Sequence, residues 1–254
     1  MSTLLLTLTG PLQAWGSGSR FSVRQTEKTP TKSGVIGLLA AAQGLERDAP
    51  LGKLASLRFG ARADVPGRIV RDFQTARTLD GKESMPLSQR YYLSDATFLV
   101  GLESEDDQLL EDLVQQLRAP VFPLYLGRRS CPPSGPIRTE IYAGTIEEAF
   151  AAVPLQARSA VALRDTRSET ITAEVQVDST PNEPGALRLR DVPICFAPEH
   201  RQHEWREVNV YYVDLANPFA LKSAQEPEFQ ESDDPDGLDD LNQHDIFAAF
   251  NEEG

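Results

Sequence analysis

The sequence contains 254 residues, of which 40% are hydrophobic, and its formal net charge is −13. This length allows one large domain or a domain with an appendage, and the hydrophobic fraction supports a packed core. No apolar run approaches the roughly 20 residues that cross a bilayer, and the start lacks the basic segment of a signal peptide, so we expect a cytoplasmic protein without membrane contact.

Charge is unevenly distributed along the chain. Residues 221–254 contain eleven acidic residues and one basic residue, a net charge of −10. Residues 1–138 contain 17 basic and 14 acidic residues, a net charge of +3. The first half can therefore present a basic face to a nucleic acid, although the whole chain is acidic.

The first half predicts alternating strands and helices. In chain order, the predicted elements are a strand at 4–8, a helix at 35–45, a strand at 53–63, a strand at 96–102, a helix at 105–118 and a strand at 121–126. The strands are short apolar or alternating runs, and the second helix has apolar residues at helical spacing. Thr31 or Ser33 would cap the first helix. This order matches the ferredoxin-like pattern, an α+β fold in which two helices cover one face of an antiparallel sheet.

A polar segment separates the second and third predicted strands. It carries five basic residues, Arg68, Arg71, Arg77, Lys82 and Arg90. Its Asp-Gly pair at 80–81 is typical of a hairpin turn. We therefore expect a protruding hairpin, here called the arm.

The remaining chain predicts mostly strands, with one short helix near 145–152. We expect a first domain at 1–135, with the arm inserted at about 64–92, and a smaller β-rich part at 136–220. The acidic tail at 221–254 contains prolines and predicts disorder. Within it, residues 238–250 have apolar residues spaced for a short helix.

Two short segments are candidates for binding phosphate groups. Gly127, Arg128, Arg129 and Ser130 form a sharp turn after a predicted strand. Arginines there can donate several hydrogen bonds, and glycine lets backbone amides approach a phosphate. The alternative is a surface turn with two solvated arginines.

The second phosphate candidate is Lys32-Ser33-Gly34, which opens the first predicted helix. A helix N-terminus offers unpaired N–H groups and partial positive charge. The alternative is a simple helix cap. The segment lacks the spacing of a P-loop, so nucleotide hydrolysis is not indicated.

A third candidate follows the first strand, at Gln13, Trp15 and Gly16. A tryptophan beside glycine can stack on a base. The alternative is that the tryptophan anchors its loop in the core.

Candidates for catalysis or metal binding are few. His200 and His203 are a possible metal pair or general base, and the alternative is a polar loop before a strand. Tyr91 and Tyr92 beside Arg90 offer phenols for acid–base work, and the alternative is packing in the core. No cofactor and no metal site is expected.

Four ordered motifs together resemble a known family. They are GPLQAWG at 10–16, PTKSGVIGLLA at 30–40, YYLSDATF at 91–98 and YLGRRSCP at 125–132. This set is similar to the CasD family of CRISPR-associated proteins in its type I-E form, over roughly residues 1–215. The resemblance implies a ferredoxin-like (RRM-like) domain with an inserted thumb hairpin and a β-rich C-terminal part.

The resemblance also implies a role in antiviral defence. The protein would be a non-catalytic subunit of the Cascade surveillance complex that binds the 5′ handle of the crRNA. Its partners would be the crRNA, the backbone subunit, the large subunit and, indirectly, target DNA. Two rivals remain open. One is a metal-independent endoribonuclease that processes pre-crRNA, although no histidine lies in the arm or the turn at 127–130; the other is an unrelated ferredoxin-like protein.

The residues expected to contact RNA are spread over four segments. Expected contacts are Gln13, Trp15, Gly16, Lys32, Ser33, Gly34, Arg71, Arg77, Arg90, Gly127, Arg128, Arg129 and Ser130. Met85 and Leu87 would form the apolar tip of the arm, wedged between bases. The acidic tail does not match the family pattern, and we expect it to compete with RNA for the basic face.

Overall fold

The computed structural model describes residues 1–254 except 17–22, 158–162, 164–167, 180–184, 198 and 221–254. The chain divides into two units, residues 1–220 and residues 221–254. The second unit contains the predicted disordered tail and the predicted helix at 238–250, which therefore lie outside the described residues.

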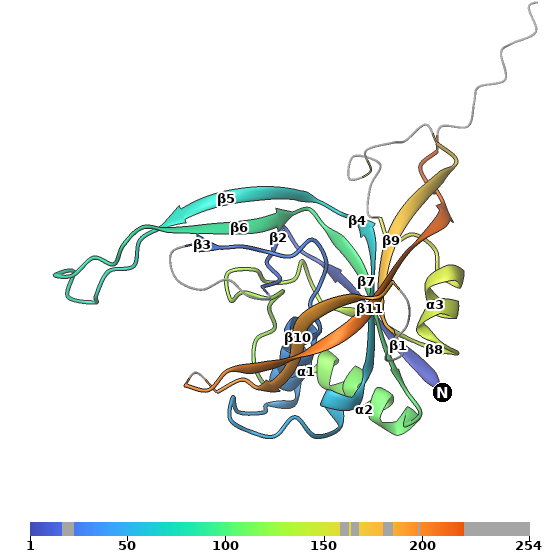
Figure 1. The fold of residues 1–254 in the computed structure, drawn as a ribbon, viewed down its shortest axis with the longest axis horizontal. Helices are drawn as coiled ribbons and strands as arrows, with labels where there is room; N and C mark the ends of the chain where they lie inside the picture. Colours follow the sequence, from blue (N-terminus) through green and yellow to red (C-terminus); the bar gives the residue numbers. More distant parts are fainter. Residues whose placement is uncertain (17–22, 158–162, 164–167, 180–184, 198, 221–254) are drawn as a thin grey trace, which may run out of the picture. The chain divides into compact units, whose positions relative to one another are not determined.

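A seven-stranded antiparallel sheet forms the centre of the first unit (Figure 1). Its strands, in sheet order, are β10 (Leu187–Cys195), β11 (Gln202–Ala216), β9 (Thr170–Asp178), β4 (Arg58–Val65), β7 (Thr97–Ser104), β1 (Ser2–Thr9) and β8 (Arg138–Ala143). Strands β1, β4 and β7 are almost entirely buried because helices cover both of their faces. The expected α+β class is confirmed.

Helices α1 (Lys32–Gln43) and α2 (Asp107–Arg118) pack together on one face of the sheet. The hydroxyl of Thr31 accepts a hydrogen bond from the Gly34 amide, at 3.3 Å, so Thr31 is the cap. Gly44 ends the helix with φ +79°, a left-handed conformation that favours glycine. In α2, leucines at helical spacing point into the same core. Both predicted helices of the first half are confirmed.

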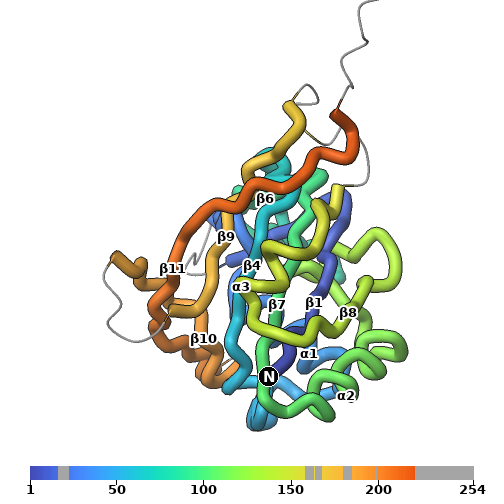
Figure 2. The backbone as a smooth tube through the Cα atoms, turned by 90° about the vertical axis from the view of Figure 1, so that its right-hand side faces the viewer, coloured from blue at the N-terminus to red at the C-terminus, as the bar shows by residue number. Residues whose placement is uncertain are grey.

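Helix α3 (Ile146–Ala152) covers the opposite face of the sheet. Figure 2 shows it lying across β4 and β7. Ile146 and Phe150 pack there against Leu5 and Leu99. Thr145 and Glu148 form a capping box, so the sequence marks the start of this helix unambiguously. The helix predicted near 145–152 is confirmed.

The strand predicted at 121–126 is wrong. Prolines in and before this segment remove ladder donors. The amides of Val121 and Phe122 donate instead to the carbonyls of Ala42 and Ala41, at the end of α1. The strand beside β1 is β8, which begins a dozen residues later.

The expected boundary at 135/136 does not separate two sheets. Strand β8 pairs along β1, and β9 pairs along β4, so strands from both halves share one sheet. None of the helices among the described residues is long and apolar enough to span a membrane.

The arm is part of a second, smaller sheet. It contains β2 (Leu12–Gln13), β6 (Ser88–Ser94) and β3 (Val23–Arg24) in that order, and β5 (Arg68–Gln74) pairs with β6. The hairpin of β5 and β6 projects from the body (Figure 1). Near its end, Gly81 has φ +71° and donates to the Thr78 carbonyl, at 2.9 Å, as the Asp-Gly turn signal predicts.

Candidate nucleic-acid interface

Three arginines from separate segments gather on one face at the base of the arm. Arg90 of β6 pairs with Arg24 of β3 and with Asp72 of β5. Directly paired residues point to the same face of a sheet, and every second residue shares it, so Tyr92 lies there too. The guanidinium of Arg128 lies 4.9 Å from the centre of the Tyr92 ring. This face is therefore basic, with one carboxylate opposite Arg90.

Arg128 ties the arm to the turn at 127–130. Its guanidinium donates to the carbonyl oxygens of Tyr91 at 3.1 Å, Arg24 at 2.9 Å and Gln25 at 3.2 Å. These bonds hold the second strand of the arm and the 24–25 segment together. Arg129 beside it is exposed and makes no hydrogen bond or ion pair with any described residue. Of the two arginines predicted to bind phosphate, Arg128 forms bonds within the protein and has a structural role. The guanidinium of Arg129 is exposed and available to a ligand.

The turn at 127–130 packs tightly against the segment that follows β1. Gly127 has φ +84°, and a Cβ added there would lie 1.8 Å from the Ala14 carbonyl oxygen. The Ala14 amide donates to the Leu126 carbonyl at 3.1 Å, which holds the two segments together. Only glycine satisfies both the backbone angle and the close approach. This contact places Arg128 and Arg129 beside the arm.

The prediction that Gln13 and Trp15 contact bases is wrong for this conformation. Both side chains are fully buried. The amide group of Gln13 donates to the Ala96 carbonyl at 2.8 Å and accepts from the indole N–H of Trp15 at 3.1 Å. A Cβ on Gly34 would lie 2.7 Å from the Trp15 ring, so the indole fills the space beside α1. Trp15 therefore anchors its loop in the core, which was the alternative interpretation. The neighbouring Gly16 is exposed, and its predicted RNA contact stays a prediction.

The phosphate site predicted at Lys32-Ser33-Gly34 is also wrong. The Lys32 amide donates to a carboxylate oxygen of Asp191 at 2.8 Å, and its ammonium group binds Asp178 at 2.8 Å. Lys32 and Ser33 are each only 7% exposed. Protein carboxylates therefore occupy the helix start that a phosphate would need.

Arg206 completes this buried ion network. It binds Asp191 and Asp178, each at 2.6 Å. Burial alone would lower its pKa, but the hydrogen bonds and charges of the two carboxylates raise the pKa of Arg206 above its ordinary value. The network joins α1 to β9, β10 and β11, so its role is to fix these elements.

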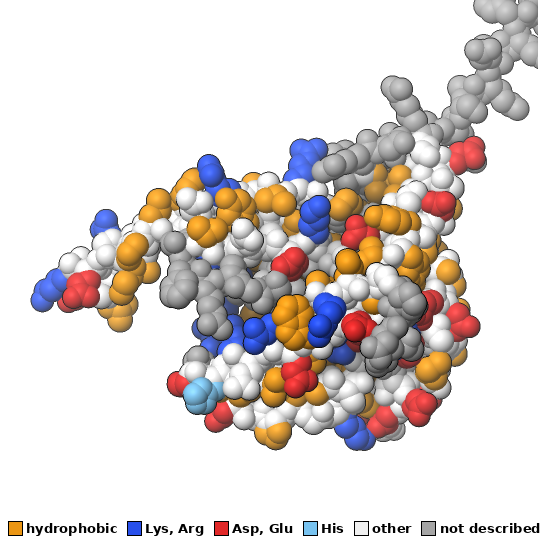
Figure 3. Space-filling view, viewed as in Figure 1, with side chains coloured by type: hydrophobic (Ala, Val, Ile, Leu, Met, Phe, Trp, Pro, Cys, Tyr) orange, Lys and Arg blue, Asp and Glu red, His pale blue; other side chains and the backbone are white. Residues whose placement is uncertain are grey.

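The arm beyond its base combines arginines with exposed apolar side chains. Met85 and Leu87, the predicted tip residues, are each 54% exposed. Sequence reasoning missed Ile69 and Phe73, which are also exposed. Arg71 lies 4.8 Å from the Phe73 ring centre. The alternation of Arg, Ile and Phe within 68–74 was the signal that could have identified this surface. In Figure 3 hydrophobic and basic side chains alternate along the arm.

Arg77 is exposed and lies beside Ser84 across the hairpin. Arg71, Arg77 and Arg90 thus all lie on the arm, as the sequence predicts, and Arg24 is a basic residue that sequence reasoning missed. Arg24 could have been identified only from its register with Arg90, which depends on a contact between distant segments.

The candidates for catalysis are dispersed. Tyr92 is 3% exposed and packs under Arg128. Burial lowers the pKa of His203, which lies on β11 opposite Pro193. Over the described part of the chain, no three His, Cys, Asp or Glu side chains form a group that could hold a metal ion.

Solved structures of CRISPR proteins have a fold similar to that of this chain. A chain of a "CRISPR RNA-guided surveillance complex" superposes with a TM-score of 0.67 and 28% identity, over 88% of this chain and 95% of that chain. A "Crystal structure of Cas protein" matches with a TM-score of 0.61 and 35% identity, over 86% of this chain and 97% of that chain. The similarity in fold and sequence places the chain among the CRISPR-associated proteins.

Sequence comparison narrows the class to one family. The family model "CRISPR-associated protein (Cas_Cas5)" matches residues 3–209. The "CRISPR system Cascade subunit CasD" of Escherichia coli (strain K12) is 35% identical in an alignment of 156 positions that covers 54% of this chain and 69% of that protein. The chain belongs to the Cas5 family, and the resemblance to CasD seen in the sequence is confirmed.

Proposed function

We propose that this chain is a non-catalytic subunit of a Cascade surveillance complex and that it holds the 5′ handle of the crRNA. The observation that carries the proposal is the basic face at the base of the arm, formed by Arg24, Arg90 and Arg128 and flanked by Arg129. The relatives, a Cascade subunit and a chain of an RNA-guided surveillance complex, support membership of such a complex.

To stay bound to the protein, the 5′ handle needs contacts to its sugar–phosphate backbone above all, because most protein–nucleic acid hydrogen bonds go to phosphate and sugar. Arg24 and Arg129 are exposed. Arg90 is half-buried and held beside the hydroxyl of Ser88. These guanidinium groups are spread over the arm base and the adjacent turn, so they suit several consecutive phosphates along one strand.

The exposed apolar residues of the arm suit a second task. Met85, Leu87 and Phe73 are each about half exposed, although exposed apolar clusters cost free energy in water. We infer that they wedge between bases of the guide, as apolar side chains of other proteins do between base steps. Arg71 and Arg77 would then hold the flanking phosphates.

The fold supports the same assignment. Strands β8, β1, β7 and β4 lie side by side, with α1 between β1 and β4 and α2 between β7 and β8 along the chain. We infer that this part is the ferredoxin-like domain and that β9, β10 and β11 extend its sheet. The backbone subunit and the large subunit of the complex are the protein partners we expect, with target DNA an indirect partner, in the cytoplasm.

The test compares two double variants that lose the same charge. Arg71→Ala with Arg90→Ala removes cations from the arm. Arg47→Ala with Arg118→Ala removes exposed cations from the helical face of the body. We expect only the arm variant to lose crRNA when the assembled complex is purified. Equal retention in both variants would contradict the site.

A cleavage assay tests the non-catalytic part of the proposal. Purified protein is incubated with repeat RNA in EDTA. We expect intact RNA, and a single specific cut would show that the chain is an endoribonuclease instead.

A further inference from the structure

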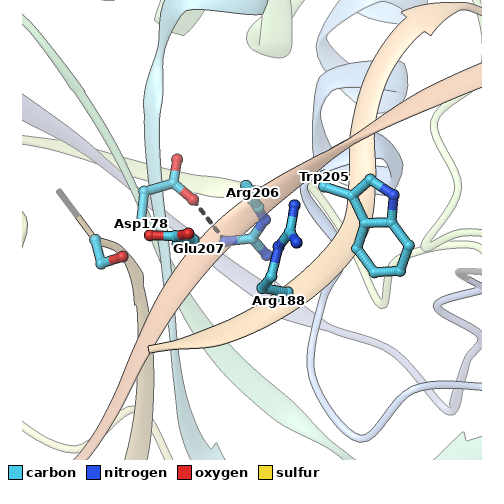
Figure 4. Close-up of a pocket in the computed structure, with 6 residues that line it drawn as sticks. Asp178, Arg188, Trp205, Arg206 and Glu207 are labelled. Atoms are coloured by element: carbon cyan, nitrogen blue, oxygen red, sulfur yellow. Dashed lines mark hydrogen bonds and ion pairs between the residues drawn. The ribbon is translucent and has the colours of Figure 1, made fainter. Parts of the chain in front are cut away.

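The last two long strands carry a second surface suited to nucleic acid. The molecule has two tryptophans, and the one on β11, Trp205, is 57% exposed. It lines a hollow together with Arg188, Arg206, Asp178 and others from β9, β10 and β11 (Figure 4). None of these residues belongs to the arm or to the turn at 127–130.

The indole ring is held in place by basic side chains. Arg190 lies directly opposite Trp205 in the β10–β11 register, and Arg188 lies opposite Glu207. The guanidinium of Arg188 reaches diagonally across to within 5.6 Å of the Trp205 ring centre. Arg190 is anchored through its Nε, which donates to the His203 carbonyl at 3.2 Å. The Arg188 guanidinium therefore lies at the indole ring, and Arg190 is the cross-strand neighbour of Trp205 on the same face of the sheet.

Most of the acidic charge in this region is neutralised. Asp178 and Asp191 are paired with Lys32 and Arg206 in the buried network, where two cations balance two anions. On the face of β10 and β11 that carries the indole, Arg188 and Arg190 lie with one carboxylate, that of Glu207, and the neighbouring Glu204 is on the opposite face of β11. Neither Arg188 nor the terminal nitrogens of Arg190 form a hydrogen bond or ion pair with any residue that the structure describes.

The hollow also contains an unsatisfied hydroxyl. The side-chain oxygen of Ser179 is buried and has no hydrogen-bond partner there. A buried polar atom without a partner costs free energy. Because this oxygen is buried, the groups open to a ligand at this site are the ring for stacking and the cations for phosphate.

We propose that this surface binds one unpaired nucleotide of a single-stranded nucleic acid. The base stacks on the open side of the Trp205 indole, and its flanking phosphates are bound by Arg188 and Arg190. Stacking on an aromatic ring tolerates any base, because every base has a π face. This site is separate from the arm, so the chain would contact nucleic acid at two places.

Intrinsic fluorescence tests the proposal directly, because Trp15 is buried and Trp205 is exposed. Titrating the full chain with an oligouridylate of about ten nucleotides should quench the emission in a saturable way. Because Trp205→Ala removes the reporter, its affinity is measured by the fluorescence anisotropy of a dye-labelled oligouridylate, and it should be about 5- to 150-fold weaker than that of the wild type. Arg188→Ala with Arg190→Ala should weaken it too and reduce its dependence on salt.

Two variants make the result specific. Tyr212→Ala removes a 65% exposed aromatic from the same strand but from its opposite face, and should leave the affinity unchanged. The arm variant Arg71→Ala with Arg90→Ala should retain the quenching of Trp205, so failure of the arm site and failure of this site are distinguishable.

The proposal is overturned if the oligonucleotide leaves the emission unchanged. It is also overturned if Trp205→Ala binds RNA like the wild type. If that variant then binds another subunit of the complex more weakly than the wild type does, the surface around Trp205 is a protein contact instead.

Discussion

Replacing Arg128 by alanine separates its structural role from RNA binding. The side chain donates three hydrogen bonds, to the carbonyls of Tyr91, Arg24 and Gln25, and stacks on Tyr92. The site is partly exposed, so water can replace part of each lost bond. With about 0.5–1.5 kcal/mol per bond and about 0.5–1 kcal/mol for the ring contact, Arg128→Ala should lower the free energy of unfolding by about 2–5 kcal/mol.

Arg129→Ala is the matched control, because it removes the same charge from the neighbouring position. Arg129 is exposed and has no bonds to described residues, so its loss should change stability by no more than about 0.5 kcal/mol. Urea denaturation of both variants measures the difference through the midpoint at constant slope. We expect Arg129→Ala to unfold like the wild type and to bind crRNA more weakly, and Arg128→Ala to lose both stability and binding. A wild-type midpoint for Arg128→Ala would refute the structural role.

Four further outcomes follow from the structure. Arg71→Ala and Arg90→Ala should each reduce the salt dependence of RNA binding by about one unit of slope, measured by titration at several salt concentrations; an unchanged slope would remove that residue from the interface. Asp191→Ala removes one of the two carboxylates that balance Arg206 and Lys32 and leaves the Lys32 amide without its acceptor, so thermal or urea unfolding should show a loss of about 3–5 kcal/mol in the free energy of unfolding, and a loss under 1 kcal/mol would contradict the network. Burial raises the pKa of Tyr211 to about 12 from 10.0. The unfolded chain then loses its proton first, so stability should fall between pH 10.0 and about 12, and Tyr211→Phe should abolish that fall in urea titrations. Deleting 221–254 removes a net charge of −10 and should raise non-specific RNA affinity; equal affinity would reject competition by the tail.

Local patterns predicted the elements whose sequence specifies their own shape. The leucines of α2 have helical spacing, and the capping box at Thr145 marks the start of α3. The Asp-Gly pair predicted the turn near the end of the arm. These signals are complete within a few residues, so no knowledge of distant contacts is needed.

The errors arose where distant residues decide the outcome. The phosphate site at Lys32 failed because its partners, Asp178 and Asp191, lie 146 and 159 residues further along the chain. Trp15 is buried against α1 and Gly34, which its neighbours in sequence do not reveal. Strand β8, and not 121–126, pairs with β1 because proline removes donors and α1 offers carbonyls. Register and ion pairing across such distances cannot be obtained from one sequence.

The candidate RNA-binding site was predicted only in part, again because distant contacts bring some of its residues into place. The arm and its arginines were found because a polar, basic segment with a turn signal is a local feature. Arg24 was missed because only the parallel pairing of β3 with β6 brings it beside Arg90. Trp205 was missed because its exposure is a property of the folded sheet.

Photocross-linking of the assembled complex tests the central claim most directly. A crRNA with a photoreactive uridine in its 5′ handle is cross-linked, and the attached peptides of this chain are identified by mass spectrometry. The account predicts cross-links to strands β5 and β6 and to the turn at 127–130. Handle cross-links confined to the helical face formed by α1 and α2, with none on the arm, would contradict it.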